Sequence, residues 1–387
     1  MTARVYLDWN ATAPVAPDVA HAVAERLTRP GNASSTHAEG REARREIERA
    51  REEIARLLDA APGEVVFLSG GSEANALALR GLVAARAAAG RPVRQIIVSA
   101  IEHDSVWESA RALGLDVYEL PVLASGQIDL DALETQLSRE PASLVSLMLA
   151  NNETGVMQPV EDAARLAAKA GALIHSDAVQ GPGKITVSFK ALGLDAMTIS
   201  GHKFGAPQGT GALILREGVE IEPQIRGGRQ ELGRRAGTEN VAAIMGLGLA
   251  AAKARNEDHF ARPALRHWFE EELRRAVPHA VIYGEGAPRL PNTVCVGVEG
   301  FQAETQVIAL DLAGFAVSAG AACSSGKVRQ SRVLTAMGVD SLSASSAIRV
   351  SWGQETRQEE LERFRDAWAA HIARATRVRP KVAGAAE

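Results

Sequence analysis

Along the first 215 residues, short continuous apolar runs alternate with longer segments in which apolar residues recur every three or four positions. The short runs are typical of strands that are buried on both faces of a sheet. The longer segments have the spacing of helices that bury one face. This alternation predicts an α/β fold with a mostly parallel sheet covered by helices. We expect strands in EVVFL (64–68), RQIIVSA (94–100), SLVSLML (143–149), ALIHSD (172–177) and AMTIS (196–200), and helices at 41–58, 72–90 and 160–171.

A second, smaller unit follows this alternating region. An alanine-rich run at 241–254 predicts a long helix, and its GLGLAA stretch lacks the preceding strand that a dinucleotide-binding motif requires. Beyond a polar stretch, NTVCVGV, FAVSAGA and SAIRVSWG are predicted strands of an α+β unit. A chain of 387 residues is long enough for two domains. We expect a large domain at 14–258 and a small domain formed by 1–13 and 259–387.

Composition narrows the class of protein. The apolar share of 46% and the charged share of 23% are those of an ordinary globular protein, and a net charge of −4 argues against nucleic-acid binding. Two cysteines cannot form a disulfide framework, which favours a reducing compartment, the cytoplasm. The start of the chain has no apolar signal segment, and no window is apolar enough to span a membrane. We also expect no metal site.

Polar residues follow the predicted strands at the point where each strand ends. In an open parallel sheet, ligands bind at the carboxyl ends of the strands, so we expect these side chains to line one site. In chain order the strands lead to Ser69-Gly70-Gly71-Ser72, Glu102-His103, Asn151-Asn152-Glu153, Asp177 with Gln180, and Ser200-Gly201-His202-Lys203.

Each of these residues also has a purely structural interpretation. Gly71 and Ser72 before a helix can form a simple turn and cap, or they can cradle a phosphate at the helix N-terminus. No lysine follows them as in a P-loop, which disfavours a nucleotide triphosphatase. A lone His103 is more often structural than catalytic, and Asp177 is a plausible helix cap. Lys203, in contrast, follows a buried strand, where a lysine is costly unless it is partnered or used to form a Schiff base.

Taken together, these residues match the needs of pyridoxal phosphate, which are a phosphate cradle, an acid for the ring nitrogen, a stacking imidazole and a Schiff-base lysine. In this interpretation Asp177 keeps the ring nitrogen protonated. Gln180 forms a hydrogen bond with the ring hydroxyl, and His103 stacks on the ring and moves protons. Lys203 forms the Schiff base. The phosphate is held beside Gly71 by Ser72, Ser200 and His202.

The motifs also resemble a known family. They are VYLDWNATAPV, GNASSTH, VVFLSGGSEANALAL, EHDSV, ANNETGV, HSDAVQ, SGHKFGAPQGTGAL, GGRQELGRRAGTEN, SAGAACSSG and IRVSWG, in order from about residue 5 to residue 353. This set resembles the cysteine desulfurases of the class-V aminotransferase family, in the branch that supplies sulfur for iron–sulfur clusters. The RRAGTEN stretch is especially similar to the members associated with nitrogen fixation.

The resemblance implies a homodimeric transferase of the fold-type-I pyridoxal phosphate class that converts L-cysteine to L-alanine. It implies that Lys203 carries the cofactor and that Asn152, beside the cofactor, binds the substrate carboxylate together with Arg349. It further implies that Thr238 reaches the cofactor phosphate of the partner subunit. Cys323 would hold the sulfur as a persulfide and pass it to an acceptor such as an iron–sulfur scaffold protein. The small neighbours of Cys323 suit a thiol that has to travel, whereas Cys295 lies in an alternating strand pattern and is expected to be core.

The same resemblance leaves alternatives open. The protein could instead be a selenocysteine lyase, a sulfur donor for tRNA thiolation, an aminotransferase that does not need Cys323, or a non-catalytic scaffold. Ser72 stands where the family usually has threonine, and it keeps the hydroxyl. After Cys323 the family commonly has an acidic segment, but this chain has Lys327, Arg329 and Arg332. We expect these cations either to steer an acidic acceptor or only to keep an exposed loop solvated.

Overall fold

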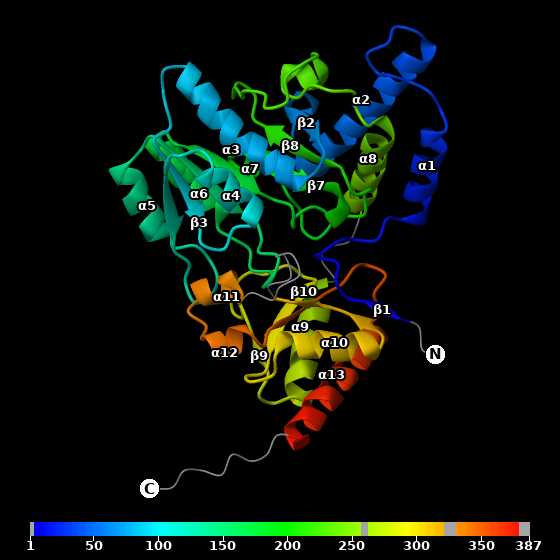
Figure 1. Cartoon of the computed structure of the whole chain (residues 1–387), viewed down its shortest axis with the longest axis vertical. Helices are drawn as coiled ribbons and strands as arrows, with labels where there is room; N and C mark the ends of the chain where they lie inside the picture. The colour runs from blue at the N-terminus through cyan, green and yellow to red at the C-terminus, as the bar shows by residue number, and fades with distance from the viewer. Residues whose placement is uncertain (1–3, 257–261, 321–329, 379–387) are drawn as a thin grey trace.

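The computed structural model describes residues 4–256, 262–320 and 330–378. The described chain forms two lobes (Figure 1), with the large sheet and helices α1 to α8 in one, and β9, β10, α9, α10 and α13 in the other. Among the described residues, no helix is long and apolar enough to cross a membrane. Three residues discussed above, Cys323, Lys327 and Arg329, lie outside the described residues.

The large lobe is built on a seven-stranded sheet with the strand order β2-β8-β7-β6-β5-β3-β4. Strands β3 to β7 run parallel to one another, as predicted, whereas β8 runs antiparallel between β2 and β7. The strands are β2 (Val65–Leu68), β3 (Gln95–Ser99), β4 (Asp116–Leu120), β5 (Ser143–Met148), β6 (Leu173–Asp177), β7 (Ala196–Ser200) and β8 (Gly211–Leu215). Every residue of β5, β6 and β7 is buried, which explains their continuous apolar pattern.

Helices cover both faces of this sheet and form two apolar cores, one on each side. They are α1 (Pro17–Leu27), α2 (Ala38–Leu58), α3 (Gly71–Ala88), α4 (Asp104–Arg111), α5 (Leu130–Arg139), α6 (Val160–Ala170), α7 (Phe189–Leu192) and α8 (Val241–Arg255), with short 3₁₀ turns at Pro62–Glu64, Gly201–Lys203 and Gln230–Gly233. The glycines of GLGLAA serve packing, because a Cβ on Gly248 would lie 2.6 Å from Ala50 of α2. The stretch lies inside α8 and follows no strand, so it is not a dinucleotide-binding motif.

The small lobe contains a four-stranded sheet with the order β12-β13-β10-β9. Its strands are β9 (Val281–Ile282), β10 (Thr293–Gly297), β12 (Ser318–Ala319) and β13 (Ile348–Ser351). The helices are α9 (Arg262–Ala276), α10 (Ala303–Leu312), α11 (Arg332–Ala336), α12 (Ser341–Ala344) and α13 (Gln358–Val378). An aromatic cluster of Phe269, Phe315, Trp352 and Phe364 lies in the core of this lobe.

One strand prediction was wrong. The FAVSAGA run is not a single strand, because β11 (Phe315–Ala316) pairs with β1 (Val5–Tyr6) while β12 pairs with β13. The chain therefore leaves one sheet and enters another at Val317, and β11 and β12 each pair over only two residues. Periodicity could not reveal this change, because both parts remain apolar or small.

The N-terminal segment crosses between the lobes. After β1, the backbone of Trp9 donates to Ser351 in β13, and a few residues later Ala13 donates to the carbonyl of His202. The segment thus touches the small sheet first and the end of β7 next. The expected domain division at 13/14 and 258/259 stays a prediction.

Candidate active site

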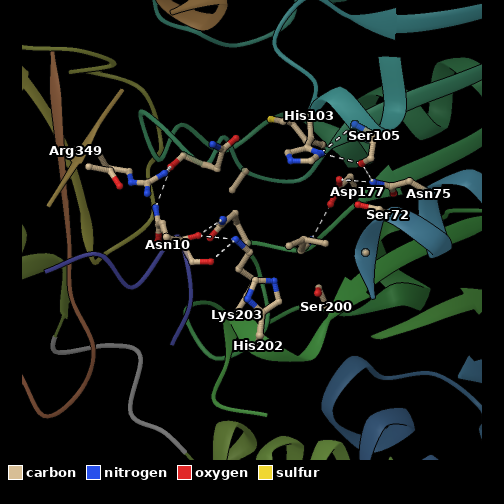
Figure 2. Close-up of a pocket in the computed structure, with 18 of the residues that line it drawn as sticks. Asn10, Ser72, Asn75, His103, Ser105, Asp177, Ser200, His202, Lys203 and Arg349 are labelled. Atoms are coloured by element: carbon tan, nitrogen blue, oxygen red, sulfur yellow. Dashed lines mark hydrogen bonds between the residues drawn. The ribbon is translucent and has the colours of Figure 1, made fainter. Parts of the chain in front are cut away.

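A cavity of about 410 Å³ lies between the carboxyl ends of the central strands and the small sheet (Figure 2). It is lined by all but two of the site residues that the sequence predicted. Those lining it are Gly71, Ser72, His103, Asn152, Asp177, Gln180, Ser200, His202, Lys203 and Arg349. Asp8, Asn10, Asn75, Ser105, Met148 and Ser318 also line it and were not predicted.

An anion cradle lies at the N-terminus of α3. No side chain caps this helix, so its first N–H groups have no side-chain acceptor. A Cβ on Gly71 would lie 3.0 Å from Val179 and 3.4 Å from the Cβ of Ser200, so glycine preserves the space there. The hydroxyls of Ser72 and Ser200 line the same cavity. Uncapped N–H groups, a helix dipole and two hydroxyls form a suitable site for a phosphate.

Asp177 ends β6 and presents its carboxylate to the cavity. The Oδ2 atom accepts a hydrogen bond from Nδ2 of Asn75 at 2.8 Å, and Oδ1 accepts from the backbone N–H of Val179 at 3.0 Å. Both oxygens are thus held in place by donors on two different elements. A fixed, largely buried carboxylate of this kind is suited to bind a protonated ring nitrogen.

His103 is the N-cap residue of α4, and its ring lines the cavity. The Nδ1 atom lies 2.8 Å from Oγ of Ser105 and accepts a hydrogen bond from the backbone N–H of Ser105 at 3.1 Å. The same Oγ accepts from Nδ2 of Asn75 at 2.9 Å. Figure 2 shows these contacts as a chain that runs from His103 through Ser105 and Asn75 to Asp177.

Lys203 lies in the 3₁₀ turn that follows β7. Its Nζ donates to the carbonyl oxygens of Asn10 at 2.7 Å and Ala11 at 2.9 Å. The neighbouring His202 is half-buried, with Nδ1 3.2 Å from Oγ1 of Thr12. Burial, followed by the nearby charges of Lys203 and Lys184, lowers the pKa of His202 to about 4. His202 is therefore neutral at physiological pH and meets an anion as a hydrogen-bonding group rather than as a cation.

Asn10 joins several parts of the site. Its carbonyl also accepts from Nε2 of Gln180 at 3.0 Å, and its Oδ1 accepts from the buried Lys184 at 2.9 Å. Its Nδ2 donates to the carbonyl of Asn152 and to Oγ1 of Thr293. Lys184 donates to Oε1 of Gln180 as well, which turns the amide nitrogen of Gln180 to the opposite side. Sequence reasoning missed Asn10 because no predicted strand ends there.

Arg349 lies in β13 and reaches the cavity from the small lobe. It donates to the carboxylate of Asp8 at 2.6 Å and to the carbonyl of Asn152 at 3.0 Å. Its side chain is 2% exposed, and its Nε has no hydrogen-bond partner among the described residues. Asp8 in turn accepts from Ser318 at 2.8 Å. A buried guanidinium that lines a cavity and has a remaining donor suits the binding of a carboxylate.

The other predicted site residues lie elsewhere. Thr238 lines a separate cavity of about 170 Å³ together with Ser69 and Arg235. Cys323 lies outside the described residues. Cys295 is fully buried in β10, where burial raises the pKa of its thiol far above the ordinary value, so the core assignment holds.

Of the three cations that follow Cys323, Arg332 lies within the described residues, and its side chain is 40% exposed. It begins α11, and its guanidinium lies 5.3 Å from the centre of the Trp107 ring. It also donates to the carbonyl of Glu102 and lies 3.5 Å from the carboxylate of Asp104. Its partners come from the start of α4, which no pattern in the sequence connects with residue 332. Lys327 and Arg329 lie outside the described residues, so their expected role stays a prediction.

Two buried carboxyl groups lie close to the cavity. Burial and the nearby charge of Asp177 raise the pKa of Glu102 well above its ordinary value. Burial raises the pKa of Glu153 to about 7, although a hydrogen bond from Ser331 at 2.6 Å opposes the shift. Among the described residues, no group of three or more His, Cys, Asp or Glu side chains is arranged to hold a metal ion.

Comparison with known proteins places this geometry in a family. The family model "Aminotransferase class-V" matches residues 5–364. The chain belongs to the class-V aminotransferases. Among curated members, it is similar to a cysteine desulfurase of Cereibacter sphaeroides, with 44% identity over 367 residues that cover 93% of this chain and 94% of the relative. It is 39% identical to cysteine desulfurase IscS of Dictyoglomus turgidum and 38% identical to cysteine desulfurase NifS of Azotobacter vinelandii, covering 93% of this chain and 92% and 90% of these relatives.

Solved structures of this family show the same fold. A NifS-like protein from Rickettsia africae superposes with a TM-score of 0.86 at 35% identity, covering 96% of this chain and 99% of that one. DndA from Streptomyces lividans superposes with a TM-score of 0.72 at 37% identity, covering 88% of this chain and 97% of that one. The prediction of a pyridoxal phosphate transferase fold is therefore confirmed.

Class-V aminotransferases use pyridoxal phosphate, and the residues of this cavity fit that cofactor. The uncapped N-terminus of α3 and the space above Gly71 suit its phosphate. The carboxylate of Asp177 suits its ring nitrogen, and the amine of Lys203 suits its aldehyde. The fit rests on donors and acceptors that converge on one cavity from the ends of three strands.

Proposed function

We propose that this protein is a pyridoxal phosphate-dependent cysteine desulfurase that converts L-cysteine to L-alanine for iron–sulfur cluster assembly. The observation that carries the proposal is the convergence of Lys203, Asp177 and Arg349 on one cavity. The amine binds the cofactor, the carboxylate tunes its ring and the guanidinium is placed for an amino acid carboxylate. Similarity to named cysteine desulfurases over 93% of the chain supports the choice of substrate.

In this proposal the small lobe binds the substrate. The carboxylate of L-cysteine accepts from Arg349, whose Nε is buried without a partner, and from the side chain of Asn152 at the end of β5. Asp8 holds the guanidinium from the opposite side at 2.6 Å, which limits its rotation. The substrate amine thereby points toward Lys203, on the wall formed by β7.

Bound pyridoxal phosphate supplies an electron sink for negative charge at the substrate Cα. Ser72, Ser200 and the N–H groups of α3 hold the phosphate, and Asp177 keeps a proton on the ring nitrogen. Gln180 donates to the ring hydroxyl, because its Oε1 is already engaged by Lys184. Lys203 would take the Cα proton of the bound substrate.

Sulfur transfer needs a thiolate, which we assign to Cys323. Its sulfur attacks the sulfur of the substrate, so that an S–S bond forms as the Cβ–S bond breaks. The electron pair of the broken bond stays with the carbon skeleton, which becomes alanine after protonation. Cys295 cannot take this role, because its thiol is fully buried and its pKa is raised. His103, on the cavity wall, handles protons near the substrate sulfur.

We also propose that the enzyme acts as a homodimer in the cytoplasm and passes sulfur to a scaffold protein. Thr238 lines its own cavity, which is consistent with a contact to the cofactor phosphate of the partner subunit. Nearby, Leu232 has a left-handed φ of 58° and is 75% exposed. A strained apolar residue at the surface is what a contact with a second copy would explain. Size measurement in solution tests this dimer.

The test of the activity is to incubate the purified protein, loaded with pyridoxal phosphate, with L-cysteine and a thiol reductant. We expect equal amounts of alanine and sulfide. Without reductant, mass spectrometry should find one additional sulfur atom on Cys323. A Cys323→Ser variant should keep the visible absorbance of the cofactor and lose the persulfide. The matched Cys295→Ser variant should keep both. Alanine formation that survives Cys323→Ser unchanged, or sulfur on Cys295, would overturn the proposal.

A further inference from the structure

The hydrogen bonds around His103 specify which ring nitrogen carries the proton. The backbone N–H of Ser105 points at Nδ1 at 3.1 Å. A backbone N–H can only donate, so Nδ1 has to accept and has no proton of its own. The neutral ring then carries its proton on Nε2, at the edge opposite Ser105. This is the same bond by which His103 caps α4, so a proton on Nδ1 would remove the cap.

The side chain of Ser105 selects the same tautomer. Its Oγ accepts from Nδ2 of Asn75 at 2.9 Å and lies 2.8 Å from Nδ1 of His103. Because the donor from Asn75 approaches from one side, the hydroxyl proton is directed to Nδ1. Nδ1 thus faces two donors that belong to one residue.

The orientation of Asn75 is set in turn by Asp177. Its Nδ2 has two hydrogens, and the second goes to Oδ2 of Asp177 at 2.8 Å. A flipped amide would place Oδ1 against this carboxylate, which can only accept, and the contact with Asp177 therefore excludes the alternative. Oδ1 of Asn75 is buried without a partner among the described residues, so the orientation is maintained at the cost of one unsatisfied acceptor.

We propose that Asn75 and Ser105 are positioning residues that hold His103 as the Nε2-protonated tautomer, so that the imidazole offers the cavity a donor and not a lone pair. Asp177 orients this chain, but an amide separates it from His103 and no proton passes between them. The consequence for the substrate rests on the proposed function. An N–H donor at Nε2 favours the sulfur of L-cysteine as a thiolate, because hydrogen bonds to an anion are the stronger ones.

The tautomer is measured directly by two-dimensional ¹H–¹⁵N spectra of the full-length, cofactor-loaded protein labelled with ¹⁵N-histidine. A His103→Gln variant identifies the signals. We expect Nε2 to resonate as a protonated, pyrrole-type nitrogen and Nδ1 as an unprotonated, pyridine-type nitrogen. A protonated Nδ1, or equal averaging of the two nitrogens in the wild-type protein, would overturn the inference.

The variants Ser105→Ala and Asn75→Ala test the two side chains. Each variant removes one directing hydrogen bond. We therefore expect the ratio of the Nε2-protonated to the Nδ1-protonated tautomer to fall about 5-fold, which is the effect of losing one hydrogen bond between neutral groups. Ser105→Thr keeps the hydroxyl and should restore the wild-type spectrum. Ser109→Ala, on the same helix but outside this chain of bonds, is the matched control and should change nothing. Wild-type spectra in both alanine variants would assign the tautomer to the backbone alone and refute the positioning role.

This readout is separate from the activity test of the proposed function. If the protein releases no alanine from L-cysteine, the assignment of the function fails while the tautomer stands on its own spectra. If alanine is released but Nδ1 is protonated, the function stands and the inference fails. Under the inference, Ser105→Ala lowers kcat for alanine release and leaves the KM for L-cysteine near that of the wild type.

Discussion

The cavity has two walls that are built in different ways. The sheet wall consists of Ser72, Asp177, Ser200 and Lys203, all at the ends of strands or the start of α3 in the large lobe. The crossing wall consists of Asp8, Asn10, Ser318 and Arg349, from the N-terminal segment and the small sheet. In the proposed function, the sheet wall binds the cofactor and the crossing wall binds the substrate carboxylate.

The two walls differ in how far their contacts reach along the chain. In the sheet wall, Asp177 is held by Val179, two residues away, and by Asn75 of α3, 102 residues away. In the crossing wall, Arg349 binds Asp8 across more than three hundred positions. The comparison suggests that changes in the sheet wall abolish the chemistry, whereas changes in the crossing wall weaken substrate binding and leave the cofactor in place.

The largest effect is expected from Lys203→Ala in the sheet wall. Removing the amine should abolish the visible absorbance of the bound cofactor, because the cofactor loses its covalent attachment. It should also abolish all alanine release, because no base remains to take the Cα proton. Absorbance spectra, borohydride reduction and peptide mapping measure this. Lys169→Ala, an exposed lysine on α6, is the control. A borohydride-fixed adduct on Lys184 in the variant would contradict the assignment and move the attachment to the neighbouring buried lysine.

In the crossing wall, Arg349→Gln should raise the KM for L-cysteine by roughly 10- to 100-fold, the range that a lost hydrogen bond to a charged group gives. The cofactor absorbance should stay, because Arg349 donates to Asp8 and Asn152 and not to the sheet wall. Steady-state kinetics and absorbance spectra measure the two quantities. Arg289→Gln breaks another buried ion pair of the small lobe, with Glu270, and controls for general loss of stability. Loss of cofactor in Arg349→Gln with an unchanged KM would reverse the roles of the walls.

A pH dependence of stability is expected where the two walls meet, at Glu153. The pKa of about 7 in the folded protein exceeds the ordinary 4.5, so the folded state binds this proton more tightly than the unfolded state. The contribution of Glu153 is therefore most favourable below pH 4.5 and is lost as the pH rises to about 7. Over this range the wild type should lose roughly 3 kcal/mol of unfolding free energy relative to Glu153→Gln.

Urea unfolding of the wild type and of Glu153→Gln at several pH values measures this difference. Glu161→Gln, at an exposed position of α6, is the matched control and should follow the wild type. Parallel pH profiles for the wild type and Glu153→Gln would contradict the prediction. They would show that Glu153 has the same pKa in the folded and unfolded states and that its surroundings are well solvated.

The smallest effect is expected from Arg332→Gln, outside both walls, where Arg332 contacts the start of α4. Loss of the contact with Trp107 and of the bond to Glu102 should cost about 1 kcal/mol of stability. Arg111→Gln also removes a guanidinium from Trp107 but at a more exposed position, and it should cost less. Equal stability of the wild type and Arg332→Gln, with a salt-dependent loss of sulfur transfer, would favour the steering role over the structural one.

The sheet wall was predictable from the sequence, and the crossing wall was only partly so. Strands buried on both faces have a continuous apolar pattern, and their carboxyl ends must meet at one edge, which identified Asp177 and Lys203. Asn75 and Ser105 were missed because they lie within helices, although Asn75 is one turn after Gly71 and faces the same side. Arg349 came from family resemblance alone. Asp8 and Asn10 depend on a crossing segment that has no periodicity, and the antiparallel β8 depends on pairing that local pattern does not encode.

The many bonds of Asn10 have a consequence for the order in which the molecule is made. Asn10 leaves the ribosome among the first residues, but Thr293 and Ser351, which it also binds, are synthesised near the end. The carbonyl that receives Lys203 is therefore not fixed until almost the whole chain has been released. The large sheet can form earlier, because its strands end at residue 215. Cofactor capture thus follows synthesis of the small lobe, and an unfinished chain carries the lysine but not the closed site around it.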